Sequence, residues 1–490
     1  MPDKSTKIHY TELIFILITA FTTILICSKS SPLYPINDWT DANCYMTVGR
    51  AMLKGAMPYR DLFEHKGPVI YLLHALAATV SDDSFFGVFL IEAAFCSWFL
   101  WLSYKILLFK CKSRHIWAIP LTAAVIYASK AFCHGDSAEE FCMPLILCSY
   151  FIGLKVFCGK NELSDRDSFF IGILSGIILW TKFTLLGFYA GFFLTAVFFY
   201  RKNIIKLVRM CSLIILGVGA VSIPIIIFFA ANDSLQSLFE VYFYDNLFVY
   251  SGTEEKSSLL ENLKNGFVFT YSFMPLGFTA ISIGILTAAI QKNRTDLTYT
   301  VITMLTAFLF VFAGHLSYRY YPLILAAFVP VSIAFIISFV EKRVKKIKLP
   351  TIICSGTAFT VCVGSCFLLC PNIYLMKYKK NELPQYQFAE IINQTENPTL
   401  LNYDFLDGGF YLASGIVPQF KYFCRNNTGL ETMLSGQQYY VENGIPDYIV
   451  ARSSDGNKPS FSNYTFVAES EFSYYEKNFY YYLYKRNPDS

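Results

Sequence analysis

The stretch PYRDLFEHKGPVIYLLHALAATV, residues 58–80, joins a cluster of charged and aromatic side chains to an apolar run. The apolar run, residues 68–80, is thirteen residues long. A helix needs about 20 residues to cross the hydrocarbon core of a bilayer. We therefore expect residues 68–80 to form a helix that lies in the membrane interface. This interpretation determines which face of the membrane every later loop occupies.

The composition of the chain places most of it in lipid. Its 490 residues are 54% hydrophobic, 18% aromatic and 16% charged, with a mean hydropathy of +0.42. Soluble proteins carry about 25% charged residues, so these values exclude a soluble enzyme and a disordered chain. The net charge of +4 is too diffuse along the sequence to indicate nucleic acid as a partner. We expect membrane lipids as partners and no nucleic acid.

Long apolar stretches recur as far as residue 371 and then stop. Eleven of them predict membrane-spanning helices: 11–28, 86–108, 115–133, 140–158, 168–181, 183–200, 205–230, 266–290, 297–314, 320–340 and 349–371. The first lacks a small-residue cleavage site, which favours a retained span over a signal peptide. From residue 372 the chain is rich in Asn, Tyr, Asp and Gly with short β-prone runs. The sequence therefore predicts an all-α polytopic domain at 1–371, with a first outer loop at 29–85, and a small α/β domain at 372–490.

The basic residues predict the orientation of the chain. With the N-terminus in the cytoplasm, the cytoplasmic segments hold 18 Lys and Arg. The outer segments between the spans hold 9 in considerably more sequence: 29–67, 134–139, 182, 231–265 and 315–319. This distribution follows the positive-inside tendency. Counting residues 68–80 as a further span would place the basic run 341–348 outside. We therefore expect a multi-pass protein of the cytoplasmic membrane, with a cytoplasmic N-terminus and an extracytoplasmic C-terminal domain.

Charged residues are unusually dense in the first outer loop for so apolar a chain. Tyrosines, a phenylalanine and the turn formers Gly55, Gly67 and Pro68 are interspersed with its charges, which suggests a shaped surface. A solvated loop whose charges only avoid lipid is the alternative. Between residues 38 and 66 the ionisable residues are Asp38, Asp41, Arg50, Lys54, Arg60, Asp61, Glu64, His65 and Lys66.

This loop resembles that of a known family. The pattern is Asp41-x-x-x-Tyr45, then Leu53-x-Gly55-x-x-Pro58-Tyr-Arg-Asp61, then Phe63-Glu-His-Lys-Gly-Pro68-x-x-Tyr71. It is similar to the first outer loop of the GT-C integral membrane glycosyltransferases, in the bacterial branch related to protein O-mannosyltransferases and lipid A aminoarabinose transferases. The resemblance implies a GT-C-like fold over roughly residues 10–371 and an essential aspartate at Asp41. Many relatives have Asp-Glu there, whereas Ala42 follows Asp41, so a joint role with Asp38 stays open.

The chemistry that the resemblance implies needs a base and positive charge. A sugar on a polyprenyl phosphate already carries its leaving group, so transfer requires a base for the acceptor hydroxyl and cations for the departing phosphate. Asp41 is the candidate base. The candidate donor-phosphate ligands are Lys66, Lys182, Arg319, Tyr59 and Arg60, and Glu64, His65 and Tyr320 complete the candidate site.

For the residues at the outer ends of later spans, a structural role is an alternative to a role in binding or catalysis. Lys182 interrupts a long apolar run and either snorkels to the interface or, as in relatives, binds the carrier phosphate. Glu139 either caps a helix or contacts a sugar, a metal or the base. Arg319 suits a phosphate, whereas Tyr320 also fits an aromatic belt. No cysteine spacing suggests a zinc site. No cofactor is predicted, although a divalent metal stays open as an alternative.

Three functions remain as alternatives. The leading hypothesis is a glycosyltransferase that moves a sugar from a polyprenyl-phosphate donor to a lipid, cell-wall glycan or protein acceptor at the outer face. A transporter or flippase of lipid-linked sugars would need polar residues at mid-membrane, and a noncatalytic scaffold would leave the charged loop without a role. The C-terminal domain either recognises the acceptor or acts as a structural lid. Cys44, Cys370 and Cys424 are predicted to lie toward the outer face, and a disulfide among them stays open.

Overall fold

The computed structural model describes residues 8–159, 162–249, 258–314, 317–344, 350–427, 430–474 and 477–488. The chain divides into two compact units. The helical unit comprises Met1–Ser28, Phe89–Pro224 and Lys256–Ile373, and the mixed unit comprises Lys29–Val88, Ile225–Glu255 and Tyr374–Ser490. The first outer loop is thus grouped with the C-terminal tail. The division of the chain into domains at residue 372 stays a prediction.

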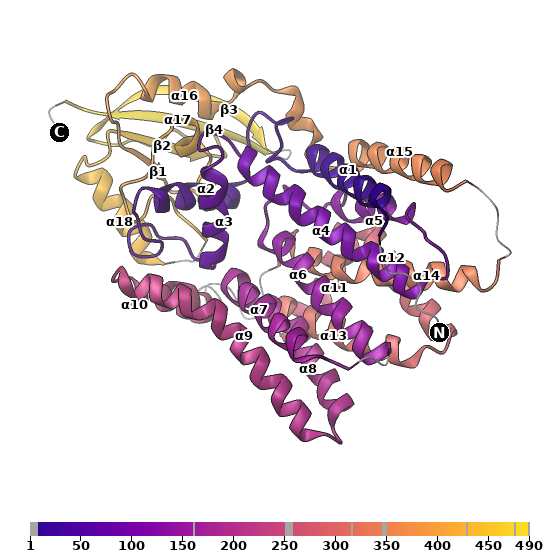
Figure 1. The fold of residues 1–490 in the computed structure, drawn as a ribbon. Coiled ribbons are helices and arrows are strands. Elements are labelled where there is room, and N and C mark those ends of the chain that lie inside the picture. The colour runs from indigo at the N-terminus through magenta and orange to yellow at the C-terminus, as the bar shows by residue number, and fades with distance from the viewer. Residues whose placement is uncertain are drawn as a thin grey trace. The chain divides into compact units, whose positions relative to one another are not determined.

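The helical unit consists of apolar helices, drawn from indigo to orange in Figure 1. In the described part of the chain, eight helices are long and apolar enough to cross a membrane, or nine if one bent pair counts as a span. This confirms the predicted all-α polytopic architecture. The individual α-helices of this unit, some of them parts of one span or too short to cross a membrane, are α1 Tyr10–Cys27, α4 Phe86–Lys110, α5 Ala118–Tyr127, α6 Ala138–Gly153, α7 Asp165–Lys182, α8 Gly187–Tyr200, α9 Ile204–Ala231, α11 Leu259–Phe273, α12 Pro275–Ile290, α13 Arg294–Phe312, α14 Val329–Glu341 and α15 Thr351–Leu369.

The structure differs from the eleven predicted spans in three places, so that number stays a prediction. The span predicted at 115–133 contains only α5, whose ten residues reach about 15 Å of the roughly 30 Å hydrocarbon core. The span predicted at 266–290 is α11 and α12, bent by 108°. Pro275 causes this bend, because it has no N–H to donate and disfavours helical backbone at Met274. The two spans predicted at 168–200 form one helical run, Asp165–Tyr200, with extended backbone at Lys182.

Two short helices organise the first loop in the mixed unit. Helix α2 spans Thr40–Leu53, and α3 spans Pro68–Ala78 with its proline in the first turn. At eleven residues, α3 is too short to span, as its sequence predicted. Gly49 allows α2 to approach α3 closely, since a Cβ atom there would lie 2.6 Å from the backbone nitrogen of Ala75.

The C-terminal tail forms a four-stranded sheet of order β1-β2-β4-β3, drawn in yellow in Figure 1. The strands are β1 Leu400–Tyr403, β2 Tyr448–Ser453, β3 Tyr464–Tyr474 and β4 Lys477–Arg486. Strands β1 and β2 run parallel, and β3 and β4 pair as an antiparallel hairpin. The tail helices are α16 Pro384–Ile392, α17 Phe410–Ser414 and α18 Glu431–Glu442, and the segment 225–255 adds α10 Leu235–Ser237 and the π-helix Leu238–Val249.

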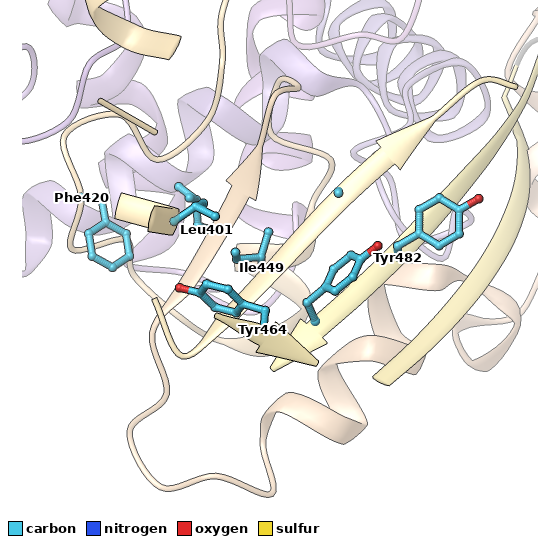
Figure 2. Packing of buried hydrophobic residues seen from close by; sticks show 8 residues of the cluster. Leu401, Phe420, Ile449, Tyr464 and Tyr482 are labelled. Carbon is cyan, nitrogen blue, oxygen red and sulfur yellow. The ribbon is translucent and has the colours of Figure 1, made fainter. Parts of the chain in front are cut away.

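One apolar cluster holds the tail sheet together. Leu401, Ile449, Tyr464 and Tyr482 contribute to it from the four strands, and Phe420 packs beside them (Figure 2). Aromatic and β-branched side chains suit such a pleated, half-buried surface. The tail is therefore a small α/β fold with its own core, as its composition predicted.

Candidate functional site

Asp41 and Lys66 form a partly exposed charged pair in the first loop. Asp41 lies in the first turn of α2, where the helix dipole favours a carboxylate. Its Oδ2 is 3.7 Å from Lys66 Nζ, and the Tyr45 hydroxyl donates to the same oxygen at 3.4 Å. The two charged side chains are 17% and 15% exposed. The arrangement offers a carboxylate that a substrate can reach, next to an ammonium group.

Asp38, the neighbouring candidate, is buried in an ion pair. Lys29 Nζ lies 2.5 Å from Asp38 Oδ1, and the two side chains are 0% and 4% exposed. The Tyr374 hydroxyl donates to the other carboxylate oxygen at 3.0 Å. These contacts hold the chain immediately before α2. The two aspartates therefore differ in environment, with Asp38 enclosed and Asp41 partly open.

Glu64 and His65 are buried beside Lys66. The Glu64 carboxylate accepts hydrogen bonds from the Tyr71 hydroxyl and from the Lys66 backbone N–H, the latter at 2.9 Å. Burial by itself would raise the pKa of Glu64, but the positive charges of His65 and Lys66 and the Tyr71 hydrogen bond hold that pKa well below its usual range. Burial and the Lys66 charge lower the pKa of His65. Glu64 is therefore an ionised, acceptor-only group at neutral pH.

Tyr59 and Arg60 take different positions although they are adjacent. Tyr59 is buried with a φ of 70°, and its hydroxyl donates to the backbone carbonyl of Lys66 at 2.6 Å. This bond supports the loop that presents the Lys66 ammonium. Arg60 is exposed, pairs with Asp61 at 2.7 Å and donates to the backbone carbonyl of Asn232 at 2.6 Å. The structure brings Tyr59 to the Asp41–Lys66 pair and gives Arg60 other partners.

A second charged pair lies in the helical unit. Lys182, at the break between α7 and the following helical turn, is 2.6 Å from Glu139 in the first turn of α6. The Glu139 side chain is 1% exposed, and its Oε2 has no hydrogen-bond partner among the described residues. Lys182 Nζ also lies 4.0 Å from the ring centroid of Tyr321 and 5.4 Å from that of Tyr320. The predicted residues Glu139, Lys182 and Tyr320 thus meet in one cluster.

Arg319 lies next to this cluster in sequence and is exposed. Its guanidinium carbon is 5.9 Å from the ring centroid of Phe273, whereas the neighbouring Tyr320 is 9% exposed. His315, which precedes Arg319 by four residues, lies outside the described residues. In the described ranges, no three His, Cys, Asp or Glu side chains group so as to hold a metal ion. A metal requirement stays a prediction.

Two contacts of Asp38, with Lys29 and with Tyr374, were not predicted from the sequence. Lys29 directly follows the first apolar span, where a basic residue ordinarily marks the membrane surface. Tyr374, its hydrogen-bond partner at 3.3 Å, is 345 residues away. A cavity of about 230 Å³ opens beside Lys29 and is lined by Asn37, Tyr386 and Lys380 among others, but not by Asp41 or Lys66. Only the tertiary structure reveals these contacts.

Solved structures share this architecture. ArnT from Cupriavidus metallidurans bound to undecaprenyl phosphate is 12% identical in sequence, and the match covers 96% of this chain and 97% of that one with a TM-score of 0.58. The chain has the ArnT fold. The apo state of the same ArnT is 13% identical over the same shares, with a TM-score of 0.59. No family model and no curated protein sequence matches the chain. The ArnT match confirms the fold that the first-loop resemblance predicted.

Proposed function

We propose that this chain is a glycosyltransferase that moves a sugar from a polyprenyl-phosphate donor to an acceptor at the outer face of the cytoplasmic membrane. The ArnT fold supports this proposal, because one ArnT structure has undecaprenyl phosphate bound. The observation that carries the proposal is the partly exposed pair between Asp41, in the first turn of α2, and Lys66, whose charged atoms are 3.7 Å apart. The acceptor is a lipid, a cell-wall glycan or a protein.

Asp41 is the base in this proposal. Its carboxylate accepts the proton of the acceptor hydroxyl while the acceptor oxygen bonds to the anomeric carbon of the sugar. The bond between that carbon and the phosphate oxygen breaks, and polyprenyl phosphate departs with the electron pair. A base must be reachable by the substrate. The side-chain exposures of 17% for Asp41 and 4% for Asp38 favour Asp41 for this role.

Cations stabilise the negative charge that grows on the departing phosphate. Lys66 lies next to Asp41 and is the first candidate. Lys182 is the candidate from the helical unit, where Glu139 orients its ammonium. Arg319, with its exposed guanidinium, is the third. Tyr59 and Glu64 position the loop that carries Lys66, through the hydrogen bonds described above.

The test measures release of free polyprenyl phosphate. The protein in nanodiscs is supplied with a panel of polyprenyl-phosphate sugars and with host membrane extract as the acceptor source. Wild type should release the carrier, and Asp41→Asn should reduce turnover by about 10²–10⁴-fold, the range that a general base contributes. Asp455→Asn is the matched control, because Asp455 is an exposed carboxylate in the tail whose contacts lie within residues 453–457.

Three outcomes contradict parts of the proposal. Equal release by wild type and Asp41→Asn keeps the enzyme but moves the base to Asp38 or Glu139. Equal loss in Asp41→Asn and Asp455→Asn indicates general damage to the protein. The absence of release by folded wild type from a complete donor panel rejects catalysis in favour of transport or scaffolding.

A further inference from the structure

Two cysteines meet in the mixed unit. Of the fourteen cysteines in the chain, Cys44 and Cys424 are the two whose positions fall in this unit. Their sulfur atoms are 3.8 Å apart although 380 residues separate them. Each side chain is 1% exposed. The two thiols therefore face each other across a buried contact within the mixed unit.

Helix α2 turns one face toward the tail, and Cys44 lies on it. Residues three apart are neighbours on a helix surface, so Cys44, Thr47 and Arg50 share this face. Thr47 donates to Asp407 at 2.6 Å, and Arg50 donates to backbone carbonyls within residues 411–416 at 3.0–3.3 Å. These bonds anchor α2 against the tail on the side where Cys44 points.

The main chain around Cys424 is anchored as well. The Arg425 backbone N–H donates to the Phe405 carbonyl at 2.9 Å, and the Phe423 carbonyl accepts from the Tyr411 hydroxyl at 2.6 Å. Hydrogen bonds therefore hold the backbone on both sides of the cysteine. Both sulfur atoms are carried by anchored segments, and rotation of the two side chains is the motion that changes their separation.

We propose that Cys44 and Cys424 form a disulfide that ties α2 to the tail in the mature protein. A disulfide has a sulfur–sulfur distance of about 2.05 Å, so the two atoms must close the gap that separates them in the reduced state. The proposal rests on the proposed function, because an oxidising compartment requires that the mixed unit lies on the outer face.

The reaction is thiol–disulfide exchange with an external protein disulfide. One cysteine thiolate attacks the oxidant, the second thiolate displaces the oxidant from the mixed disulfide, and the oxidant leaves as a dithiol that has taken up the two electrons and two protons. Burial raises the pKa of both thiols, and the thiolate is the attacking species. The exchange therefore takes place during folding, before the pair is enclosed.

This bond has a consequence for the candidate site. Asp41 precedes Cys44 by three residues on α2. A covalent link at Cys44 restrains the helical turn that carries the proposed base and fixes it to a tail that begins more than 300 residues later. The disulfide is therefore a positioning device for Asp41.

The test is differential thiol labelling of the full-length protein. Native membranes are denatured with light iodoacetamide to block thiols, then reduced and labelled with heavy iodoacetamide before peptide mapping. The Cys44 and Cys424 peptides of wild type should carry the heavy label. In Cys44→Ser, the Cys424 peptide should switch to the light label, whereas Cys211→Ser, in α9 of the helical unit, should leave both peptides heavy. Light label on both peptides in wild type overturns the proposal.

Protease accessibility of the tail in spheroplasts separates this failure from that of the proposed function. Light label together with a cleavable tail overturns the disulfide alone, since the mixed unit is then outside and reduced. Light label together with a protected tail overturns both the disulfide and the outer-face location. The transferase assay with Asp41→Asn reports on catalysis independently of either result.

Discussion

Replacing Lys29 with methionine tests the buried ion pair that precedes α2. The substitution removes the ammonium 2.5 Å from Asp38 and keeps a long apolar side chain in its place. Loss of one partner from a buried pair costs about 3–5 kcal/mol, because the other charge is left uncompensated. The Tyr374 hydroxyl continues to donate to Asp38, so we expect the lower end of this range. The free energy of unfolding in detergent micelles, from denaturant titration, is the measurement.

The double variant Lys29→Met/Asp38→Asn is the control for this prediction. Replacing both members of a buried ion pair by neutral groups is often nearly neutral. We therefore expect the second substitution to restore most of the stability that the first removes, as a double-mutant cycle would report. A loss below about 1 kcal/mol in Lys29→Met, the range of exposed pairs, would refute the reasoning. A double variant as unstable as the single variant would refute it too.

Three further predictions concern other parts of the chain. Burial raises the pKa of Asp407 to about 6, above its usual value of 3.8, so its ionisation destabilises the fold; the stability of wild type relative to Asp407→Asn should improve by about 2.4 kcal/mol between pH 7.5 and pH 4, and a pH-independent difference would contradict this. Gly49→Val should separate α2 from α3 and lower the melting temperature, whereas Gly364→Val, with open space around it, should not. Lys182→Met should leave buried Glu139 without its cation and cost about 3–5 kcal/mol in denaturant unfolding, unlike Lys182→Arg.

The fold was predictable where its signals are local. Apolar length separates α3 from the spanning helices, and the first-loop motif predicts the ArnT-like fold. The bend at Met274 also has a local signal, since Pro275 follows it, but the surrounding residues are apolar enough to suggest one uninterrupted span. The two spans predicted on either side of Lys182 are instead one helical run, Asp165–Tyr200, with extended backbone at Lys182.

The candidate site was less predictable because its contacts join distant parts of the chain. Sequence places Asp38 and Asp41 three residues apart with the same chemistry. Their different environments come from Lys29 and from Tyr374, which lies in the tail. The Glu139–Lys182 pair likewise joins two helices, so the sequence suggested each residue alone. Pairing between elements depends on tertiary packing, which a reading of local patterns does not determine.

The mixed unit is built from three separate segments of the chain, and this determines when the site can exist. Tyr374 meets Lys29 345 residues later, and Asp407 meets Thr47 360 residues later. At about 5–20 residues per second, roughly 20–70 s of synthesis separate the two sides of each contact. Until then the tail groups to which Thr47 and Arg50 donate hydrogen bonds have not been synthesised. A nascent chain therefore carries Asp41 on a helix that lacks its tail contacts. These contacts form only after residues 407–416 have been synthesised.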